Sequence, residues 1–361
     1  MSSVFLHSPP DHFGHINNID FQVIYATYLG QPCPLIAPVV GHFFGKDGVQ
    51  LDRYGANLGS VILPGQGHRR THNTLQSIVQ WMMKMSGIAS EKEALNFLLG
   101  KVGEPYITRY INHVSSVPNS RKAPHAIVPD IHAFNWPAGR QRFNDSGVSS
   151  AAEAFFEVKT FSGCKSRYKH PNSTIKPADR RAREVTREYP RKFKKLDELF
   201  TAEVVGDGTG DAVGPFEAAQ GQFYRGQVIP LCAGWFGEVN KDFEKVLRLL
   251  ARHAAAGDDG ITISPLVNTD RKGGAYPIML QQFRRAIGVA IVRGNAKLKL
   301  SRMHYVRETA QEAAAVYDAH HSKNGRWRPG RNGSGSWFSS HIPEGYGAFE
   351  QFRNGYDFCM H

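Results

Sequence analysis

Residues 126–130, Ala-Ile-Val-Pro-Asp, and residues 154–160, Ala-Phe-Phe-Glu-Val-Lys-Thr, decide the expected fold. Both segments are predicted to be short strands, because apolar β-formers dominate them and turn-forming residues fill the interval 135–150. A wide turn of that composition favours a β-hairpin. The hairpin would carry Asp130 at the end of its first strand, with Glu157 and Lys159 on its second.

The second strand would present Glu157 and Lys159 on one face, roughly 7 Å apart, because side chains alternate and each residue advances about 3.3 Å. Val158 would point the opposite way, into a core. If Asp130 lies beside Glu157, two carboxylates and the carbonyl of Val158 offer oxygen ligands for a hard divalent cation such as Mg²⁺. The ammonium of Lys159 would then orient an attacking water and stabilise charge on a phosphate.

The pattern Pro129-Asp130 followed by Glu157-x-Lys159 resembles the PD-(D/E)xK signature of the restriction-endonuclease-like nucleases. The resemblance implies an α/β fold whose central mixed β-sheet is flanked by helices. It also implies a metal-dependent phosphodiesterase in which Asp130 and Glu157 bind Mg²⁺ or Mn²⁺ and Lys159 is the catalytic lysine. The alternative is structural: Asp130 ends a strand, and Glu157 and Lys159 form a solvated pair on an edge strand.

Two further candidates come from resemblance. The run from residues 68–73 through Gly-Glu-Pro at 103–105 to the Pro-Asp looks like the endonuclease region of some non-LTR retrotransposon proteins. It makes Glu104 a candidate auxiliary metal ligand, and the alternative is a loop residue before proline. Gln220-x-x-x-Tyr224 is similar to an element that some exonucleases of the superfamily carry on the helix after Glu-x-Lys, which makes Gln220 a candidate catalytic residue.

The chain is basic, with 44 Lys and Arg against 32 Asp and Glu and a net charge of +12. This excess is typical of proteins that meet polyanions. It is concentrated in residues 165–195, directly after the catalytic motif, where a groove would hold phosphates. The expected nucleic-acid contacts are Arg69, Arg70, Lys165, Arg167, Lys169, Arg180 and Arg181. The alternative is a solvated helix face, because an apolar stripe is formed by Val185, Tyr189, Phe193, Leu196 and Leu199.

Three regions are expected along the chain. Residues 1–65 are predicted to form short strands and loops of unknown role, residues 66–306 a nuclease-like α/β domain, and residues 307–361 an extension rich in aromatic residues and glycine. Helices are predicted after residue 73 and over 90–98, where Ser90-x-x-Glu93 forms a capping box. Further helices are predicted from Pro215, from the N-cap Asn240, and over 276–306 with Gly294 as a candidate break.

Cysteine and histidine spacing excludes other classes. The four cysteines lie far apart without a Cys-x-x-Cys pair, which argues against structural zinc and a disulfide framework. No His-Glu-x-x-His spacing occurs among the 16 histidines, so zinc hydrolase chemistry is not expected. The sequence lacks a long apolar run and a signal-peptide pattern, which predicts an intracellular protein without a membrane partner and does not distinguish nucleus from cytoplasm.

Together these observations predict a metal-dependent nuclease acting on DNA, of mobile-element or viral origin, with RNA as a substrate and a dimeric state left open. One rival is a basic nucleic-acid-binding protein without catalysis, whose binding would survive Asp130→Ala. The other is an α/β enzyme for a small anionic substrate, for which duplex DNA would not compete.

Overall fold

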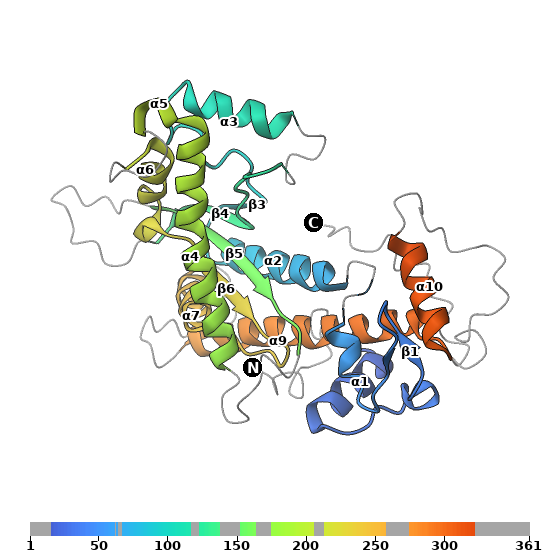
Figure 1. Cartoon of the computed structure of the whole chain (residues 1–361). Helices are drawn as coiled ribbons and strands as arrows, with labels where there is room; N and C mark the ends of the chain where they lie inside the picture. Colours follow the sequence, from blue (N-terminus) through green and yellow to red (C-terminus); the bar gives the residue numbers. More distant parts are fainter. Residues whose placement is uncertain are drawn as a thin grey trace.

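Four strands form one mixed sheet in the order β3-β4-β5-β6: β3 (Ser90–Lys92), β4 (Ile131–Trp136), β5 (Ala152–Thr160) and β6 (Ile229–Ala233) (Figure 1). The computed structural model describes residues 16–61, 63, 67–116, 123–137, 152–163, 175–205, 213–257 and 274–321. Strand β4 runs antiparallel to both β3 and β5, whereas β5 and β6 are parallel. A mixed sheet flanked by helices confirms the expected α/β class.

Strand β4 begins one residue after Asp130, so the prediction of a strand over 126–130 is wrong. The backbone of Ile127 is bound by a side chain instead: its N–H donates to the hydroxyl of Tyr110 at 3.0 Å, and that hydroxyl donates to the Ile127 carbonyl at 3.4 Å. Pro129 has no N–H to contribute to a ladder. The antiparallel pairing with β5 is confirmed, with Ile131 opposite Phe156.

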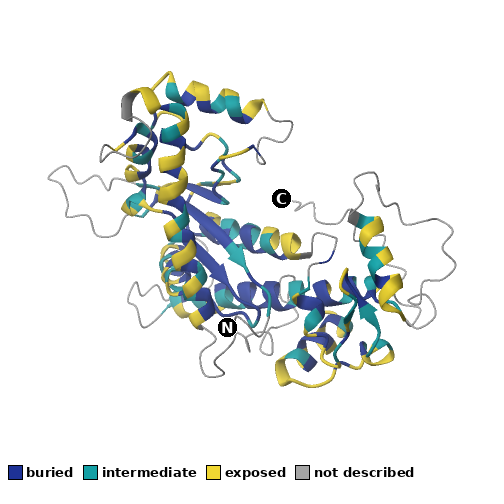
Figure 2. Ribbon diagram, in the orientation of Figure 1, coloured by how far each residue is buried: buried dark blue, intermediate teal, exposed yellow. Residues whose placement is uncertain are grey.

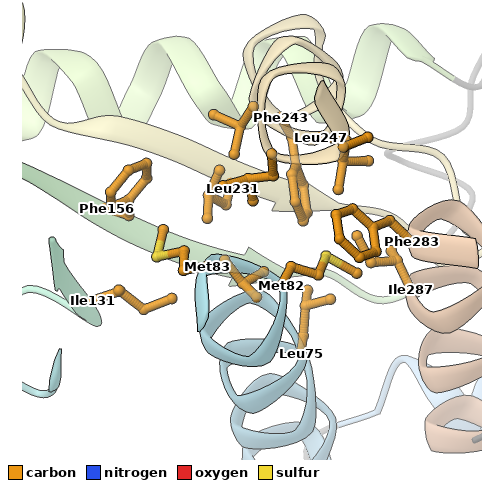
Figure 3. Packing of buried hydrophobic residues seen from close by; sticks show 14 of the residues in the cluster. Leu75, Met82, Met83, Ile131, Phe156, Leu231, Phe243, Leu247, Phe283 and Ile287 are labelled. Atoms are coloured by element: carbon orange, nitrogen blue, oxygen red, sulfur yellow. The ribbon is translucent and has the colours of Figure 1, made fainter. Parts of the chain in front are cut away.

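One face of the sheet is covered by α2 (Gly67–Met85), α7 (Lys241–Ala256) and α9 (Ala275–Arg302) (Figures 1 and 3). Phe156 and Val158 of β5 point into this core, because alternate strand residues share a face. The expected inward direction of Val158 is therefore confirmed. The predicted apolar stripe of the first helix supplies Leu75, Val79, Met82 and Met83, all fully buried. The packing shown in Figure 3 joins these helices to β4, β5 and β6.

The opposite face of the sheet is covered by α3 (Tyr106–Ser115), α4 (Ile175–Phe200) and α6 (Pro215–Gly221). Phe155 of β5 and Cys232 of β6 point into this second core. The sheet thus lies between two helical layers; β6 and the middle of β5 are buried in Figure 2, whereas the edge strand β3 is exposed or half-buried. Short helical turns follow α4 and α6, at α5 (Ala202–Val205) and at the 3-10 turn η5 (Tyr224–Gly226).

Helix α4 confirms the apolar stripe predicted within the basic run. Val185, Tyr189, Phe193 and Leu196 are buried against the sheet, whereas Leu199 is 45% exposed and lies outside the stripe. Its charged side chains cover the outward face, which is largely exposed in Figure 2. The described part of this run, residues 175–195, therefore packs through its apolar stripe and exposes most of its charged side chains to solvent, as the solvated-face alternative predicts.

The N-cap predicted for Asn240 is confirmed by the start of α7 at Lys241. The Asn240 side chain, however, makes no capping bond, because its Oδ1 accepts from the backbone N–H of Cys232 at 2.9 Å. This bond ties the helix start to β6. The bond therefore sets the position of the start of α7 relative to β6.

Residues 90–98 do not form the helix predicted from the capping box. Ser90–Lys92 is instead the edge strand β3, with Ser90 opposite Ala133 of β4. Two bonds extend the pairing, from the Phe134 N–H to the Ala89 carbonyl at 3.0 Å and from the Ala89 N–H to Asn135 Oδ1 at 2.7 Å. Pairing with the free edge of β4 satisfies more backbone groups than one capping box does.

Within residues 16–61, the described part of the N-terminal region, short strands and loops occur as predicted, but a helix is present as well. Residues 21–25, expected as a strand, lie in helix α1 (Asn18–Leu29), and Asn17 caps it by accepting from the Asp20 N–H at 2.7 Å. Residues 35–40, also read as an apolar strand, contain the 3-10 turn η2 (Ala37–Val39). The remaining elements are β1 (Phe43–Phe44), β2 (Val49–Gln50) and η3 (Asn57–Gly59).

A third hydrophobic core joins this N-terminal region to the second half of α9. Val23 and Ile24 of α1 belong to the same cluster as Val289 and Val292 of α9. The cluster continues through the 3-10 turn η6 (Met303–Tyr305), and β1 is bridged to Arg307 ahead of α10 (Ala310–His321). Helix α9 is therefore shared between two cores.

Helix α9 is continuous through Gly294, so the candidate break there is wrong. The glycine serves a close helix–helix approach, because a Cβ built at Gly294 would lie 2.7 Å from Cγ2 of Thr71 on α2. Within the described ranges, every helix is too short or too polar to span a bilayer.

Candidate active site

Asp130 is held by α2 and β5 at the point where β4 begins. Its Oδ2 accepts from the Val158 N–H at 2.7 Å and lies 3.2 Å from His72 Nε2. The side-chain amide of Gln76 donates to the Asp130 carbonyl. His72 and Gln76 are four residues apart on α2, so one helix face grips both the side chain and the backbone of Asp130.

Glu157 and Lys159 occupy the same face of β5 and form an ion pair. The register that places Ile131 opposite Phe156 puts Asp130 opposite Glu157 when extended by one residue. Directly opposed residues of an antiparallel pair share a face, with Cβ atoms about 5 Å apart. The fold therefore brings together all three residues of the motif.

Tyr189 of α4 contacts this group from the face of the sheet opposite to α2. Its hydroxyl donates to Glu157 Oε2 at 2.6 Å, while the other oxygen of Glu157 holds Lys159. Tyr189 is 1% exposed and Glu157 is 7% exposed, so the bond lies within the second core. The carboxylate is thus oriented by two partners on different elements.

Neighbouring charges raise two pKa values in this site. Burial by itself would lower the pKa of Lys159, but the carboxylates of Glu157 and Asp130 outweigh burial and raise it. The pKa of His72 is raised in the same way, against the effect of burial, by its bond to Asp130 and by the Asn73 side chain. At neutral pH the lysine is therefore an ammonium ion.

Cys232 lies beside Lys159 in the parallel register of β5 and β6. Burial raises the pKa of its thiol to about 12. A thiol with such a pKa stays protonated at neutral pH, and the thiolate is the nucleophilic form. Cys232 therefore packs in the core and does not supply a nucleophile.

The donor set suits a hard divalent cation. Asp130 Oδ1 has no hydrogen-bond partner among the described residues, and each Glu157 oxygen holds a single donor. Magnesium is commonly held by one or two carboxylates, with waters completing its octahedron. Where the structure describes the chain, three or more His, Cys, Asp or Glu side chains do not gather around a common metal position. A cation here would rest on Asp130 and Glu157, with waters and the Val158 carbonyl, the third expected ligand, as further oxygen ligands; the Val158 N–H donates to Asp130.

Two sequence candidates lie apart from this group. Glu104 is exposed before α3 and accepts a bond from Thr108 of that helix. Gln220 is buried in α6 and donates to the Gly226 carbonyl at 3.2 Å. The Gln220-x-x-x-Tyr224 spacing was expected to lie on one helix. Tyr224 instead falls in η5, beyond the end of α6, so the two residues lie on different elements.

The expected nucleic-acid contacts lie on α2, on α4 and outside the described residues. Arg69 and Arg70 are exposed in the first turns of α2, on the helix that carries His72. Arg180 is exposed on α4, whereas Arg181 is bonded to Glu184 at 2.7 Å and to Glu188 at 3.5 Å. Lys165, Arg167 and Lys169 lie outside the described residues, as do the aromatic residues beyond 321.

Sequence reasoning missed the three residues that position the motif. The sequence places Tyr189 in the apolar stripe of α4 and gives no role in the site to His72 or Gln76. A signal exists for the α2 pair, since a histidine and a glutamine four residues apart on one face of an amphipathic helix can contact the same group. No spacing rule connects Tyr189 to Glu157, because the contact depends on how α4 crosses the sheet.

We expect Tyr189→Phe to weaken Mn²⁺ binding by about 10- to 100-fold, the usual effect of losing a group that orients a metal ligand. The ring would keep its place against Phe155, at a centroid distance of 5.5 Å, so only the hydroxyl is lost. Calorimetric titration with Mn²⁺ measures the change. Tyr224→Phe is the matched control, since no hydroxyl bond of Tyr224 occurs in the described part of the chain. Equal affinities in the two variants would contradict the orienting role.

The site therefore combines two carboxylates, a lysine held as an ammonium ion and a histidine on the first carboxylate. Comparisons of the chain with protein-family models, with curated proteins and with solved structures found no match. The functional argument rests on the chemistry of these residues.

Proposed function

We propose that this protein is a metal-dependent nuclease that hydrolyses DNA phosphodiester bonds, and that its sheet and helices are a restriction-endonuclease-like core. The observation that carries the proposal is the convergence of Asp130, just before β4, with Glu157 and Lys159 of β5. Two carboxylates and one ammonium ion on a rigid sheet suit attack on a phosphodiester. The excess of basic residues supports a polyanionic substrate.

Each residue has a role in this reaction. Mg²⁺ or Mn²⁺, held by Asp130 and Glu157, would supply Lewis-acid polarisation of the phosphate. Lys159 stabilises the negative charge that develops on the phosphate, and its raised pKa keeps it protonated for this purpose. His72 and the Val158 amide fix Asp130, while Tyr189 fixes Glu157.

A non-catalytic nucleic-acid-binding protein is the second candidate. It is favoured by the ion pair between Lys159 and Glu157, which satisfies both charges without a metal ion. It is also favoured by exposed cations on α4, which can bind phosphates without any chemistry. This alternative predicts binding that needs neither a divalent cation nor Asp130.

Supercoiled plasmid incubated with Mg²⁺, with Mn²⁺ and with EDTA tests the proposal. We expect nicking with either metal, none with EDTA, and a loss of at least about 100-fold in Asp130→Asn, because the amide cannot replace the ligand charge. Asp242→Asn, an exposed aspartate on α7 paired with Lys245, controls for charge and for contaminating nucleases. Retarded plasmid without nicking under any condition would overturn the nuclease and leave the binding protein.

A further inference from the structure

The outward face of α4 carries a continuous row of cations. The row has six members, spaced three or four residues apart. Because this spacing is close to one helical turn, their side chains lie within about 80° of the helix circumference. The row spans about 27 Å along the axis, at 1.5 Å per residue. We call it the α4 ridge; its members, all exposed, are Lys176, Arg180, Arg183, Arg187, Arg191 and Lys194.

The charge of the α4 ridge is not neutralised by neighbouring acids. Within the described residues, no ion pair involves any of its six members. Glu184 and Glu188 are both bonded to Arg181, which lies outside the ridge, and Asp179, next to Arg180, accepts the backbone N–H of Lys241 at 3.0 Å. Six unpaired cations on one helix face repel one another and reduce stability, so a structural role does not account for them.

The ridge lies on the opposite side of α4 from the candidate active site. Tyr189, which binds Glu157, is rotated by about 160° from the middle of the ridge on a helix of 3.6 residues per turn. Side chains on the ridge therefore extend into solvent and not toward Lys159. A nucleic acid bound here would be held away from Asp130, Glu157 and Lys159.

We propose that the α4 ridge is a separate binding surface for the phosphate backbone of duplex DNA. The choice of DNA rests on the proposed function, but binding at the ridge does not require cleavage. The length of the ridge matches a stretch of duplex that carries about eight phosphates on each strand. Arginine outnumbers lysine in it, and the guanidinium fork binds phosphate through two parallel bonds.

A lipid surface is the less suitable partner. Helices that bind membranes insert an exposed apolar face beside their cations. On α4 that face is buried against the sheet, and over residues 176–200, where its side chains are described, Leu199 is the one exposed large apolar residue. The ridge therefore offers charge without an apolar surface to insert.

The test is equilibrium binding of a labelled duplex of about 20 base pairs, measured by fluorescence anisotropy in EDTA over a range of salt concentrations. The test variant combines Arg183→Ala, Arg187→Ala and Arg191→Ala, since alanine preserves the helix. The control combines Lys245→Ala, Arg248→Ala and Arg252→Ala on α7, which are exposed at similar spacing. Two of these are paired with acids, and Arg252 lies 5.8 Å from the Tyr276 ring.

We expect the ridge variant to bind about 10- to 100-fold more weakly, with a slope of log K against log salt shallower by about 2 to 3, because each phosphate contact contributes about 0.9. The control variant should bind like the unchanged protein. Equal binding of the duplex by both variants would overturn the proposal. Tighter binding of the unchanged protein to vesicles of phosphatidylserine and phosphatidylcholine in equal parts than to the duplex would overturn it as well. Ridge-dependent binding without plasmid nicking would reject only the nuclease.

Discussion

Lys159→Met is expected to lower metal-dependent plasmid cleavage by about 100- to 1,000-fold, the usual effect of removing one donor that stabilises developing charge. In the proposed reaction the lysine acts as an ammonium ion, and the carboxylates of Glu157 and Asp130 raise its pKa. Methionine preserves the length of the side chain but carries no charge. Initial rates of plasmid nicking at saturating Mg²⁺ measure the loss.

Folding must be separated from catalysis in this variant. Removing the ammonium leaves Glu157, which is 7% exposed, with only the bond from Tyr189, and an unpaired buried carboxylate is destabilising. Lys159→Arg retains the ion pair and should keep the melting temperature, yet it should still cleave poorly because the guanidinium places its charge differently. Lys245→Met on α7 controls for the loss of one surface lysine. Cleavage by Lys159→Met at the unchanged rate would remove Lys159 from the reaction.

Lys299→Met is expected to stabilise the protein at pH 7 by an amount on the order of 1–3 kcal/mol. Lys299 is 2% exposed, and burial lowers the pKa of its ammonium from 10.5 to about 8. That difference corresponds to a cost on the order of 3 kcal/mol for folding with the charge buried. The bonds lost are modest, since Thr27 also donates to the Val23 carbonyl and the Tyr54 carbonyl lies 3.4 Å away.

The pH dependence identifies the same group. The folded protein releases the Lys299 proton near pH 8, whereas the unfolded chain releases it near 10.5. Between these values the unfolded chain binds more protons, so the free energy of unfolding rises with pH in the unchanged protein. Below pH 8 both states are protonated and the full cost is present. The advantage of Lys299→Met should therefore shrink as the pH rises from 8 toward 10.5.

Urea unfolding of both proteins at pH 7, 9 and 10 measures this difference. Lys297→Met, an exposed lysine two residues earlier on α9, should change the free energy of unfolding by no more than about 0.5 kcal/mol. A Lys299→Met variant that is less stable than the unchanged protein at pH 7 would show that the ammonium bonds outweigh its burial.

Regular periodicity allowed several elements to be predicted from the sequence. The stripe from Leu75 to Met83 identified α2, and Asn240 marked the start of α7. The alternation in β5 gave the shared face of Glu157 and Lys159 and the inward direction of Val158. These features follow from local spacing, which a helix or strand converts directly into a face.

Local signals failed where a distant segment competed for the same backbone groups. The capping box at Ser90 was outweighed by the edge of β4, and the extended segment around Ile127 was bound by Tyr110 instead of a strand. In α1, alternating apolar residues suggested a strand, but Val23 and Ile24 pack on the second half of α9. Each outcome depends on a partner far away in the chain.

The sequence by itself determined the α/β class and the two catalytic candidates of β5, Glu157 and Lys159, because a strand period of two residues acts within one segment. Only the tertiary structure decided that Asp130 lies opposite Glu157, held by His72, and that Tyr189 binds Glu157 beneath the α4 ridge. Asp130 and Glu157 are 27 positions apart, and the pairs His72–Asp130 and Glu157–Tyr189 are 58 and 32 positions apart. Their geometry is set by how helices α2 and α4 pack on the two faces of the sheet, and no local pattern encodes that packing.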